Sequence, residues 1–458
     1  MSILRIPPEI WLKISDSLPR SDAAQLCLVN HQFLSLIRPL MYHHVSLYQV
    51  NRTCNPFLAS DPRDTIANPI DATLSLLARD GDLAQRVSGL SLYAFSWHWM
   101  SYHKFYHFHN LAVKSLIDLD AVRNMINLRR LEISGMIFHR GAIWYEREAE
   151  EVKETSAAFC EILRGIGLEE LVVHPSRDSE LPDFGIGLSL EQFSGFRGLK
   201  KLEWGSHILP GLVEGLRSLL SASRTTLETL DICVDRYTSL IQSAVFTLHF
   251  PRLRSLIFQR FPPGSSNPVR MLGLSQLYIN FVLSHNTLTR LDLGDWRRIE
   301  NDQGFSLSKY EDNLRHCPNA FPRLEWFSGD IGSLQGMVRA GLGCLSETGS
   351  LREVVVGPIR TDQQEQIEAA IAVGGVFTSL RESRVETFRL YFGKVGLEEQ
   401  TAGGDSLREE NDSISSPDVV RRIVEGFKVL FPSEADVQAG TDLEREPEER
   451  FVEVCISR

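Results

Sequence analysis

Residues 128–133 read Leu128-Arg129-Arg130-Leu131-Glu132-Ile133, and this hexamer is one copy of a pattern that returns along most of the chain. Apolar residues occupy its first, fourth and sixth positions. The alternation over its second half is typical of a short strand with one buried face. Ten copies are present, and they begin at Val87, Leu128, Leu168, Leu199, Leu227, Leu253, Leu288, Leu324, Leu351 and Val385. We therefore predict ten short strands.

The segments between the hexamers have helical spacing. Phe159, Leu163 and Ile166 form one apolar face of this kind, and Leu212, Leu216 and Leu219 form another. Consecutive hexamers begin 26 to 41 residues apart. One strand and one helix per repeat cannot bury an apolar face alone, so neighbouring repeats must stack. The predicted fold class is α/β, with short parallel strands alternating with helices in a solenoid. An ordinary α/β domain with a parallel sheet is the alternative.

The first forty residues follow a helical pattern. Ile10, Ile14 and Leu18 recur every four residues and predict a helix that Pro19 ends. A second helix is predicted with Ser21 as its N-cap, and a third is predicted after the cap Asn30, with Pro39 closing it. Three helices in about 35 residues cannot bury a full core, so some apolar side chains must meet another surface. That surface belongs either to the rest of the chain, which the helices would cap, or to a partner protein.

This N-terminal segment resembles the F-box. The resemblance rests on the opening 6–10 (IPPEI), the turn at 19–22, and Val29 followed four residues later by Phe33. Many F-boxes have Trp where Phe33 stands, and a basic pair where this chain has 31–32 (HQ). The resemblance implies a surface that binds a Skp-family adaptor, which in turn joins a cullin. The residues implied in adaptor binding are Ile6, Pro7, Ile10, Ile14, Leu18, Leu26, Val29 and Phe33.

The later part of the chain resembles leucine-rich repeats of the irregular kind that follow an F-box in filamentous fungi. It departs from the standard repeat at the turn after the strand, where an Asn is expected three residues beyond the last apolar position. Four of those places hold Met136, Asp235, Phe261 and Trp296. Without an Asn ladder to bond backbone groups at that turn, the repeats are predicted to be uneven.

Charge is concentrated near the C-terminus. The chain has 458 residues and a formal net charge of −11, and residues 398–450 hold 15 acidic and 6 basic residues, a net of −9. The rest of the chain therefore has no basic field suited to nucleic acid. We predict an F-box at 1–45, a linker and entry to the repeats at 46–86, the solenoid at 87–397, and a disordered acidic loop at 398–416. Residues 417–458 are predicted to hold a helix, an acidic stretch and a last strand that covers the solenoid edge.

Cysteine usage and hydropathy indicate an intracellular protein, in the cytoplasm, the nucleus or both. The seven cysteines are scattered, without any C-x-x-C pair, which is typical of reduced thiols. We expect no secretory signal, because residues 1–11 lack an apolar run, and no membrane span, because no segment offers about 18 uninterrupted apolar residues.

Residues 97–109 are rich in Trp, Tyr, Phe and His, and they hold the one spacing that suggests metal chemistry. His103 and His107 stand four residues apart, as two zinc ligands on a helix do, but a zinc hydrolase of the H-E-x-x-H type needs Glu where Lys104 stands. We interpret this segment as packing or a protein-binding surface. The sequence contains no phosphate-binding loop and no nucleophile elbow, so we predict no catalytic residue, no metal and no cofactor.

Charged residues recur at the third and fifth hexamer positions, on the strand face opposite the apolar positions. The fifth position holds Glu132, Glu203, Asp231 and Asp292. These carboxylates form a candidate acidic stripe for a basic peptide. Arg130, Lys201 and Arg290 stand at the third position of three of those strands, however. Local pairing is therefore expected to neutralise the stripe and leave a mixed-charge face.

Together, these features predict the substrate-recognition subunit of an SCF-type ubiquitin ligase. The F-box would bind the adaptor, and the repeats would bind a target protein that the sequence does not identify. The alternative is a repeat scaffold for protein binding that is not linked to ubiquitin. A zinc enzyme built on His103 and His107 is a third, remote class.

Overall fold

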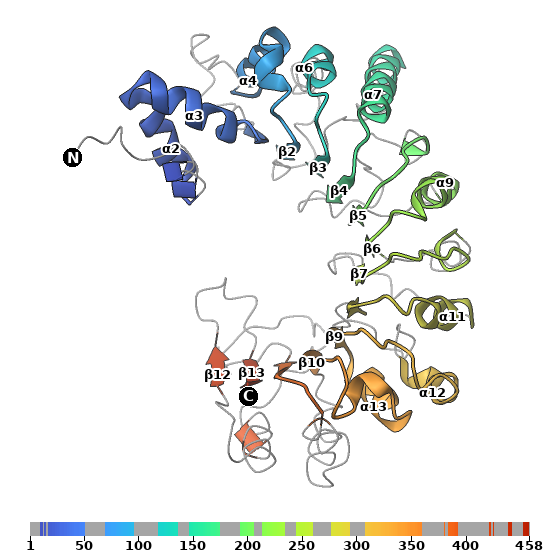
Figure 1. Cartoon of the computed structure of the whole chain (residues 1–458). Coiled ribbons are helices and arrows are strands. Elements are labelled where there is room, and N and C mark those ends of the chain that lie inside the picture. Colours follow the sequence, from blue (N-terminus) through green and yellow to red (C-terminus); the bar gives the residue numbers. More distant parts are fainter. Residues whose placement is uncertain are drawn as a thin grey trace, which may run out of the picture. The chain divides into compact units, whose positions relative to one another are not determined.

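The computed structural model describes residues 10, 11, 13, 14, 17–50, 69–95, 118–135, 146–174, 193–205, 213–233, 244–259, 276–293, 307–359, 380, 383–392, 421, 422, 425, 438–441 and 452–457. The chain divides into two compact units, Met1–Leu227 and Glu228–Arg458. Both units contain alternating helices and strands (Figure 1). The predicted α/β class with parallel strands is confirmed.

The N-terminal segment is helical, as predicted, with two corrections at its helix ends. Helix α2 spans Arg20–Val29 and helix α3 spans His31–Met41. Asn30 caps α3, because its side chain accepts a hydrogen bond from the backbone N–H of Phe33 at 2.9 Å. Ser21 is not a cap: α2 begins at Arg20, two residues earlier than a Ser21 cap implies, and its N-cap position is Pro19, without a side-chain hydrogen bond. Pro39 does not end α3, which continues for two more residues to Met41.

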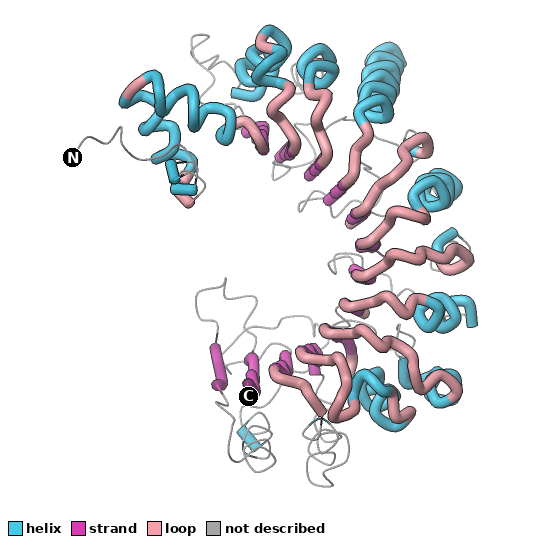
Figure 2. The backbone as a smooth tube through the Cα atoms, in the orientation of Figure 1, coloured by secondary structure: helices cyan, strands magenta, loops and turns pink. Residues whose placement is uncertain are grey.

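In the first unit, five strands lie side by side in chain order and are parallel. They are β1 (His44–Val50), β2 (Gly89–Phe95), β3 (Arg130–Gly135), β4 (Glu170–His174) and β5 (Lys201–Trp204). The helices lie on one side of these strands (Figure 2). They are α4 (Pro69–Arg79), α5 (Gly81–Ala84), α6 (Leu119–Asn124), α7 (Glu146–Ile166) and α9 (Val213–Ser223). Strand β1 begins just before the predicted linker and repeat entry at 46–86, and helices α4 and α5 lie within it.

In the second unit, six strands run parallel to their neighbours: β6 (Thr229–Cys233), β7 (Ser255–Gln259), β8 (Arg290–Asp292), β9 (Trp326–Gly329), β10 (Glu353–Ile359) and β11 (Thr387–Phe392). The helical elements between them are α11 (Gln276–Ser284), η6 (Leu307–Tyr310), α12 (Glu311–Arg315), α13 (Ile331–Arg339) and η7 (Gly343–Leu345). The predicted last strand, β13 (Val452–Ser457), pairs antiparallel with β11. A strand that we did not predict, β12 (Gln438–Thr441), pairs with the other side of β13 and becomes the edge.

The ten hexamers correspond to β2–β11, and each strand begins at the third residue of its hexamer. The first, fourth and sixth positions point into the core. In the hexamer that leads into β3, for example, Leu128, Leu131 and Ile133 have no exposed surface. The predicted disordered loop 398–416 lies outside the described residues.

Hydroxyl groups bond the backbone between repeats at the turn before the strand, not at the turn after it where the Asn ladder is missing. The residue before a hexamer donates its hydroxyl hydrogen to the carbonyl oxygen of the first residue of the preceding hexamer. This bond joins Thr226 to Leu199 at 2.9 Å, Thr287 to Leu253 at 2.6 Å, and Ser350 to Leu324 at 2.8 Å. These bonds supply a donor to carbonyl groups that the parallel strand pairing leaves without one.

His285 is fixed inside the second unit in its neutral form. Its side chain is buried, its Nδ1 lies 2.6 Å from the carbonyl oxygen of Phe281, and its Nε2 accepts a hydrogen bond from the N–H of Phe250 at 2.9 Å. The carbonyl requires the proton on Nδ1, so Nε2 is free to accept. Burial lowers the pKa of His285 from 6.5 to about 4.

This lowered pKa predicts pH-dependent stability. Because the folded-state pKa lies below the unfolded value, the contribution is present above pH 6.5 and is lost as the pH falls toward 4. We expect the free energy of unfolding to fall by about 2 kcal/mol more between pH 7 and pH 5 in the wild-type chain than in His285→Gln. Urea unfolding at each pH measures this difference. His316→Gln, at an exposed histidine, is the control and should keep the wild-type slope. An equal slope in His285→Gln would contradict the prediction.

Candidate functional site

The N-terminal segment has a small core of its own. Phe33, Ala23 and Ile37 are buried in it, and Trp11 meets Phe33 edge to face with ring centroids 4.7 Å apart. Leu26 is partly buried against the same cluster. Phe33, which we predicted as part of a binding surface, is only 8% exposed and supports the segment from inside. Its aromatic character is explained by its contact with Trp11.

Other apolar side chains of this segment are turned to solvent. Ile10 is 45% exposed, Val29 is 65% exposed, and Ile14 is also exposed. Leu18 is partly buried, and the predicted contacts Ile6 and Pro7 lie outside the described residues. Leu28, at 87%, is the most exposed large apolar residue of those described, and it was not among the predicted contacts. Exposed aliphatic side chains gathered on a small helical segment are typical of a surface that a partner covers.

The segment is joined directly to the first strand. Helix α3 ends at Met41 and β1 begins at His44, so two residues separate them. Across this junction, Arg38 pairs with Asp80 at 3.2 Å. The carbonyl oxygen of His43 accepts hydrogen bonds from the N–H groups of Ser88 at 2.8 Å and Gly89 at 3.0 Å. The N-terminal helical segment that carries the exposed side chains is therefore fixed to β1 and β2.

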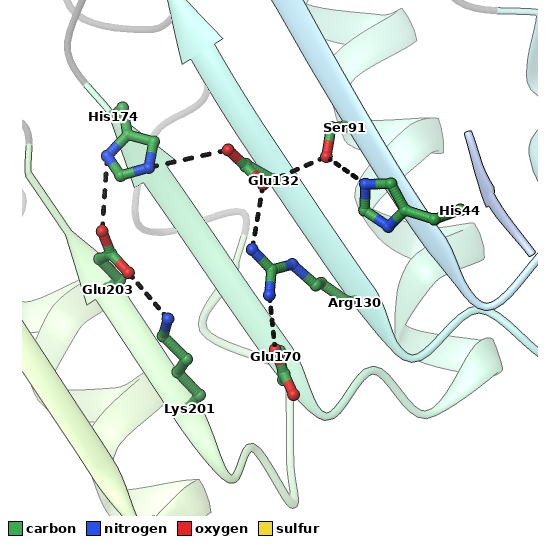
Figure 3. Close-up of polar contacts among 8 residues, drawn as sticks. All are labelled: His44, Ser91, Arg130, Glu132, Glu170, His174, Lys201 and Glu203. Atoms are coloured by element: carbon green, nitrogen blue, oxygen red, sulfur yellow. Dashed lines mark hydrogen bonds and ion pairs between the residues drawn. The ribbon is translucent and has the colours of Figure 1, made fainter. Parts of the chain in front are cut away.

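A network of paired charges covers the strand face of the first unit (Figure 3). Glu132 lies at its centre: its Oε2 is 3.1 Å from Nη2 of Arg130 and accepts a hydrogen bond from Oγ of Ser91 at 3.1 Å. Arg130 also reaches Glu170 at 3.4 Å. Every charge in this part of the network therefore has an opposite charge beside it.

The network continues to β5 through His174. Its Nε2 lies 3.8 Å from Oε1 of Glu132, and its Nδ1 lies 3.6 Å from Oε1 of Glu203. Glu203 also pairs with Lys201 at 3.0 Å. The predicted pairing of third-position cations with fifth-position carboxylates is thus confirmed in β3 and β5. In β8, Arg290 and Asp292 are 4.0 Å apart.

Ser91, His44 and Glu132 resemble the residue types of a catalytic triad, but the burial of Ser91 argues against that role. Oγ of Ser91 lies 3.1 Å from Oε2 of Glu132 and 2.9 Å from Nε2 of His44. Ser91 has no exposed surface, so its hydroxyl is not placed to reach a substrate. Gly89 makes room for the ring of His44, since a Cβ at that position would overlap Nδ1.

The described residues contain no group of three His, Cys, Asp or Glu side chains placed to hold a metal ion. In the same part of the chain, no helix is both long enough and apolar enough to cross a membrane. Burial raises the pKa of the Cys160 and Cys344 thiols to about 12, which keeps both as unreactive thiols. His103 and His107 lie outside the described ranges.

Comparison with known proteins gives one family match. Residues 3–44 match the sequence model of the F-box domain. Among solved structures, the chain is similar to one in the crystal structure of the Rad7 and Elc1 complex in yeast, with 14% sequence identity and a TM-score of 0.28. That alignment covers 68% of this chain and 64% of that chain, less than two thirds of its length. Comparison with curated proteins found no match.

Proposed function

Because the chain carries an F-box domain at residues 3–44, ahead of an irregular repeat region, we propose that it is a substrate-recognition subunit of an SCF-type ubiquitin ligase. F-box domains generally serve as adaptor-binding modules. In this proposal the F-box binds a Skp-family adaptor, the adaptor joins a cullin, and the repeats hold the target protein. The protein would work in the cytoplasm, the nucleus or both.

The observation that carries the proposal is the exposure of apolar side chains on a domain that already has its own core. Phe33 and Ile37 are buried inside the F-box, whereas Ile10, Leu28 and Val29 are exposed. The F-box therefore does not need these exposed side chains for its own packing. Covering one of them with a partner would contribute about 1.5–3 kcal/mol by burial.

The repeat strands favour a binding role over catalysis. Their open face carries paired charges in the first unit, and Ser91 there has no exposed surface. An extended strand face suits a protein target better than a small molecule, which prefers a concave pocket. The chain would accelerate ubiquitin transfer by holding the target near the ubiquitin-charged enzyme, an effect of proximity and orientation.

Co-purification with a Skp-family adaptor tests the proposal. The wild-type chain should form a stable complex, and the double variant Ile10→Asp/Ile14→Asp should bind roughly 100-fold more weakly, since it places two charges in an apolar contact. Leu277→Asp changes an apolar residue of similar exposure, 41%, on α11 and is the matched control. Circular dichroism checks that all three chains stay folded.

A wild-type chain that does not bind the adaptor would refute the proposal and favour the repeat scaffold not linked to ubiquitin. Undiminished binding by Ile10→Asp/Ile14→Asp would show that these two side chains lie outside the contact.

A further inference from the structure

The open strand face of the second unit differs in character from that of the first. The register places Arg290 of β8 beside Trp326 of β9. Ile257 of β7 lies beside Asp292, and Val355 of β10 lies beside Ser328. Ile257, Trp326 and Val355 are all partly exposed, although they occupy third or fifth hexamer positions on the face away from the core. We call Ile257, Arg290, Trp326 and Val355 the Arg290 patch.

Arg290 is held at this patch by an aromatic ring. Its guanidinium carbon lies 4.1 Å from the centroid of Trp326. Its side chain is 48% exposed, and the nearest carboxylate among the described residues, Asp292, is at 4.0 Å, beyond hydrogen-bonding distance. Within the described ranges, no hydrogen bond engages the guanidinium.

The other arginines at third or fifth hexamer positions are paired with carboxylates. Arg130 in the first unit bonds Glu132 at 3.1 Å and Glu170 at 3.4 Å. Arg389, on β11, pairs with Glu353 at 3.6 Å. Arg290 thus combines a charged donor group, partial exposure and an aromatic support, and its donors are available to a ligand.

Stacking prepares Arg290 for binding. A guanidinium lying on a ring has already lost part of its rotational freedom, so less entropy is lost when a ligand bonds to it. The planar group offers five N–H donors in an arrangement that matches the two oxygens of a carboxylate. Trp and Arg are also the residue types that most often dominate the energy of protein interfaces.

We propose that the Arg290 patch recognises the target protein through an acidic side chain, Asp or Glu, that stands next to an apolar side chain in an exposed segment. The carboxylate bonds to Arg290, and the apolar neighbour packs on Trp326 with Ile257 or Val355. This inference rests on the proposed function, because it names the class of segment that the repeats would bind.

The charge of the patch favours a carboxylate over a phosphate. Arg290 is the one cation of the patch. Among the described residues, Arg389 lies next along the sheet, but its charge is paired with that of Glu353. A phosphate carries up to two negative charges and is normally bound by several cations. One stacked arginine with a carboxylate 4.0 Å away suits a ligand with a single negative charge.

Selection from a phage-displayed random peptide library on the full chain, without adaptor, tests the inference. We expect enrichment of peptides in which Asp or Glu stands beside Leu, Ile or Phe. With a selected peptide labelled for fluorescence anisotropy, Arg290→Ala should raise the Kd on the order of 10- to 100-fold. Arg290→Lys keeps the charge but loses the planar fork and should raise it at least about fivefold.

Arg323→Ala is the matched control, because Arg323 is an exposed arginine just before β9 and outside the patch. It should leave the Kd unchanged. Thermal melting followed by circular dichroism confirms that each variant is folded. Selected peptides without an acidic residue, or equal binding by wild type and Arg290→Ala, would overturn the inference.

A phosphoserine in place of the acidic residue gives a further test. Binding tighter by more than about tenfold would overturn the carboxylate assignment, and weaker or equal binding would support it. Because no adaptor is present, failure here leaves the adaptor proposal intact. If the chain bound the peptide but not the adaptor, the result would support the Arg290 patch as a binding site and refute the ligase role.

Discussion

Replacing Phe33 by Ala is expected to unfold the F-box and, with it, to abolish adaptor binding. Phe33 is 8% exposed and packs edge to face on Trp11, so its removal leaves a cavity in a core with few other members. A Phe→Ala change in a core costs about 3–5 kcal/mol. A helical segment of this size has little stability to lose, so its helices should open.

Hydrogen exchange of the amides in α2 and α3 measures this opening directly. The matched control is Leu28→Ala, which shortens a side chain that is 87% exposed. It should leave amide protection unchanged, to within about 0.5 kcal/mol, while weakening the adaptor complex. If Phe33→Ala kept full amide protection yet lost the adaptor, Phe33 would be a contact residue after all.

Replacing Gly349 by Ala is expected to destabilise the second unit by about 3 kcal/mol or more. A Cβ at this position would overlap the carbonyl oxygen of Cys344 and lie 2.6 Å from its carbonyl carbon. Both are backbone atoms, which cannot rotate away as the end of a side chain can. The same carbonyl oxygen accepts the N–H of Leu351 at 3.2 Å, just before β10, so the displacement would reach the pairing of β10 with β9.

Gly343→Ala is the control for this prediction. The nearest atom to a Cβ there is the carbonyl oxygen of Pro318 at 3.5 Å, an ordinary contact. Urea unfolding of both variants should show a large shift of the midpoint for Gly349→Ala and a small one for Gly343→Ala. Equal midpoints for the two variants would mean that the turn before β10 can accommodate the added Cβ at Gly349 without a loss of stability.

Much of the strand framework could be predicted from the sequence, because the signal is local. Three apolar positions in each hexamer define which face is buried, and the strand begins where the alternation begins, at the third residue. Parallel stacking then places equal positions of successive hexamers side by side, as with Arg290 and Trp326. What the sequence did not indicate is that Arg290 would stack on Trp326 instead of bonding Asp292, since both partners lie within reach.

Features that depend on distant pairing were harder to predict. Strand β12 reads Gln438-Ala-Gly-Thr441 and lacks an apolar alternation, so only its pairing with β13 makes it a strand. The hydroxyl bonds before the hexamers were missed too, although Thr226, Thr287 and Ser350 occupy the same position of their repeats. That shared position is a signal in the sequence, and it replaces the Asn that standard repeats use elsewhere.

The F-box shows why helical periodicity alone does not identify a binding surface. It marks Phe33 and Val29 equally as apolar, yet one is buried and the other is 65% exposed. In a three-helix segment, apolar residues face either the other helices or the outside, and only the packing decides between these environments. Here the contact with Trp11 places Phe33 inside the segment.

The two-residue junction between α3 and β1 also bears on how fast a bound target would meet a reactive ubiquitin. With a flexible linker at this junction, a bound target would sample a large volume, and its effective concentration near the ubiquitin would be low. Here the Arg38–Asp80 ion pair and the hydrogen bonds to the carbonyl group of His43 hold the junction in place. An adaptor that grips the F-box would therefore set the direction in which β1–β5 point, and lengthening this joint with glycines should lower the local concentration of any cargo carried on those strands.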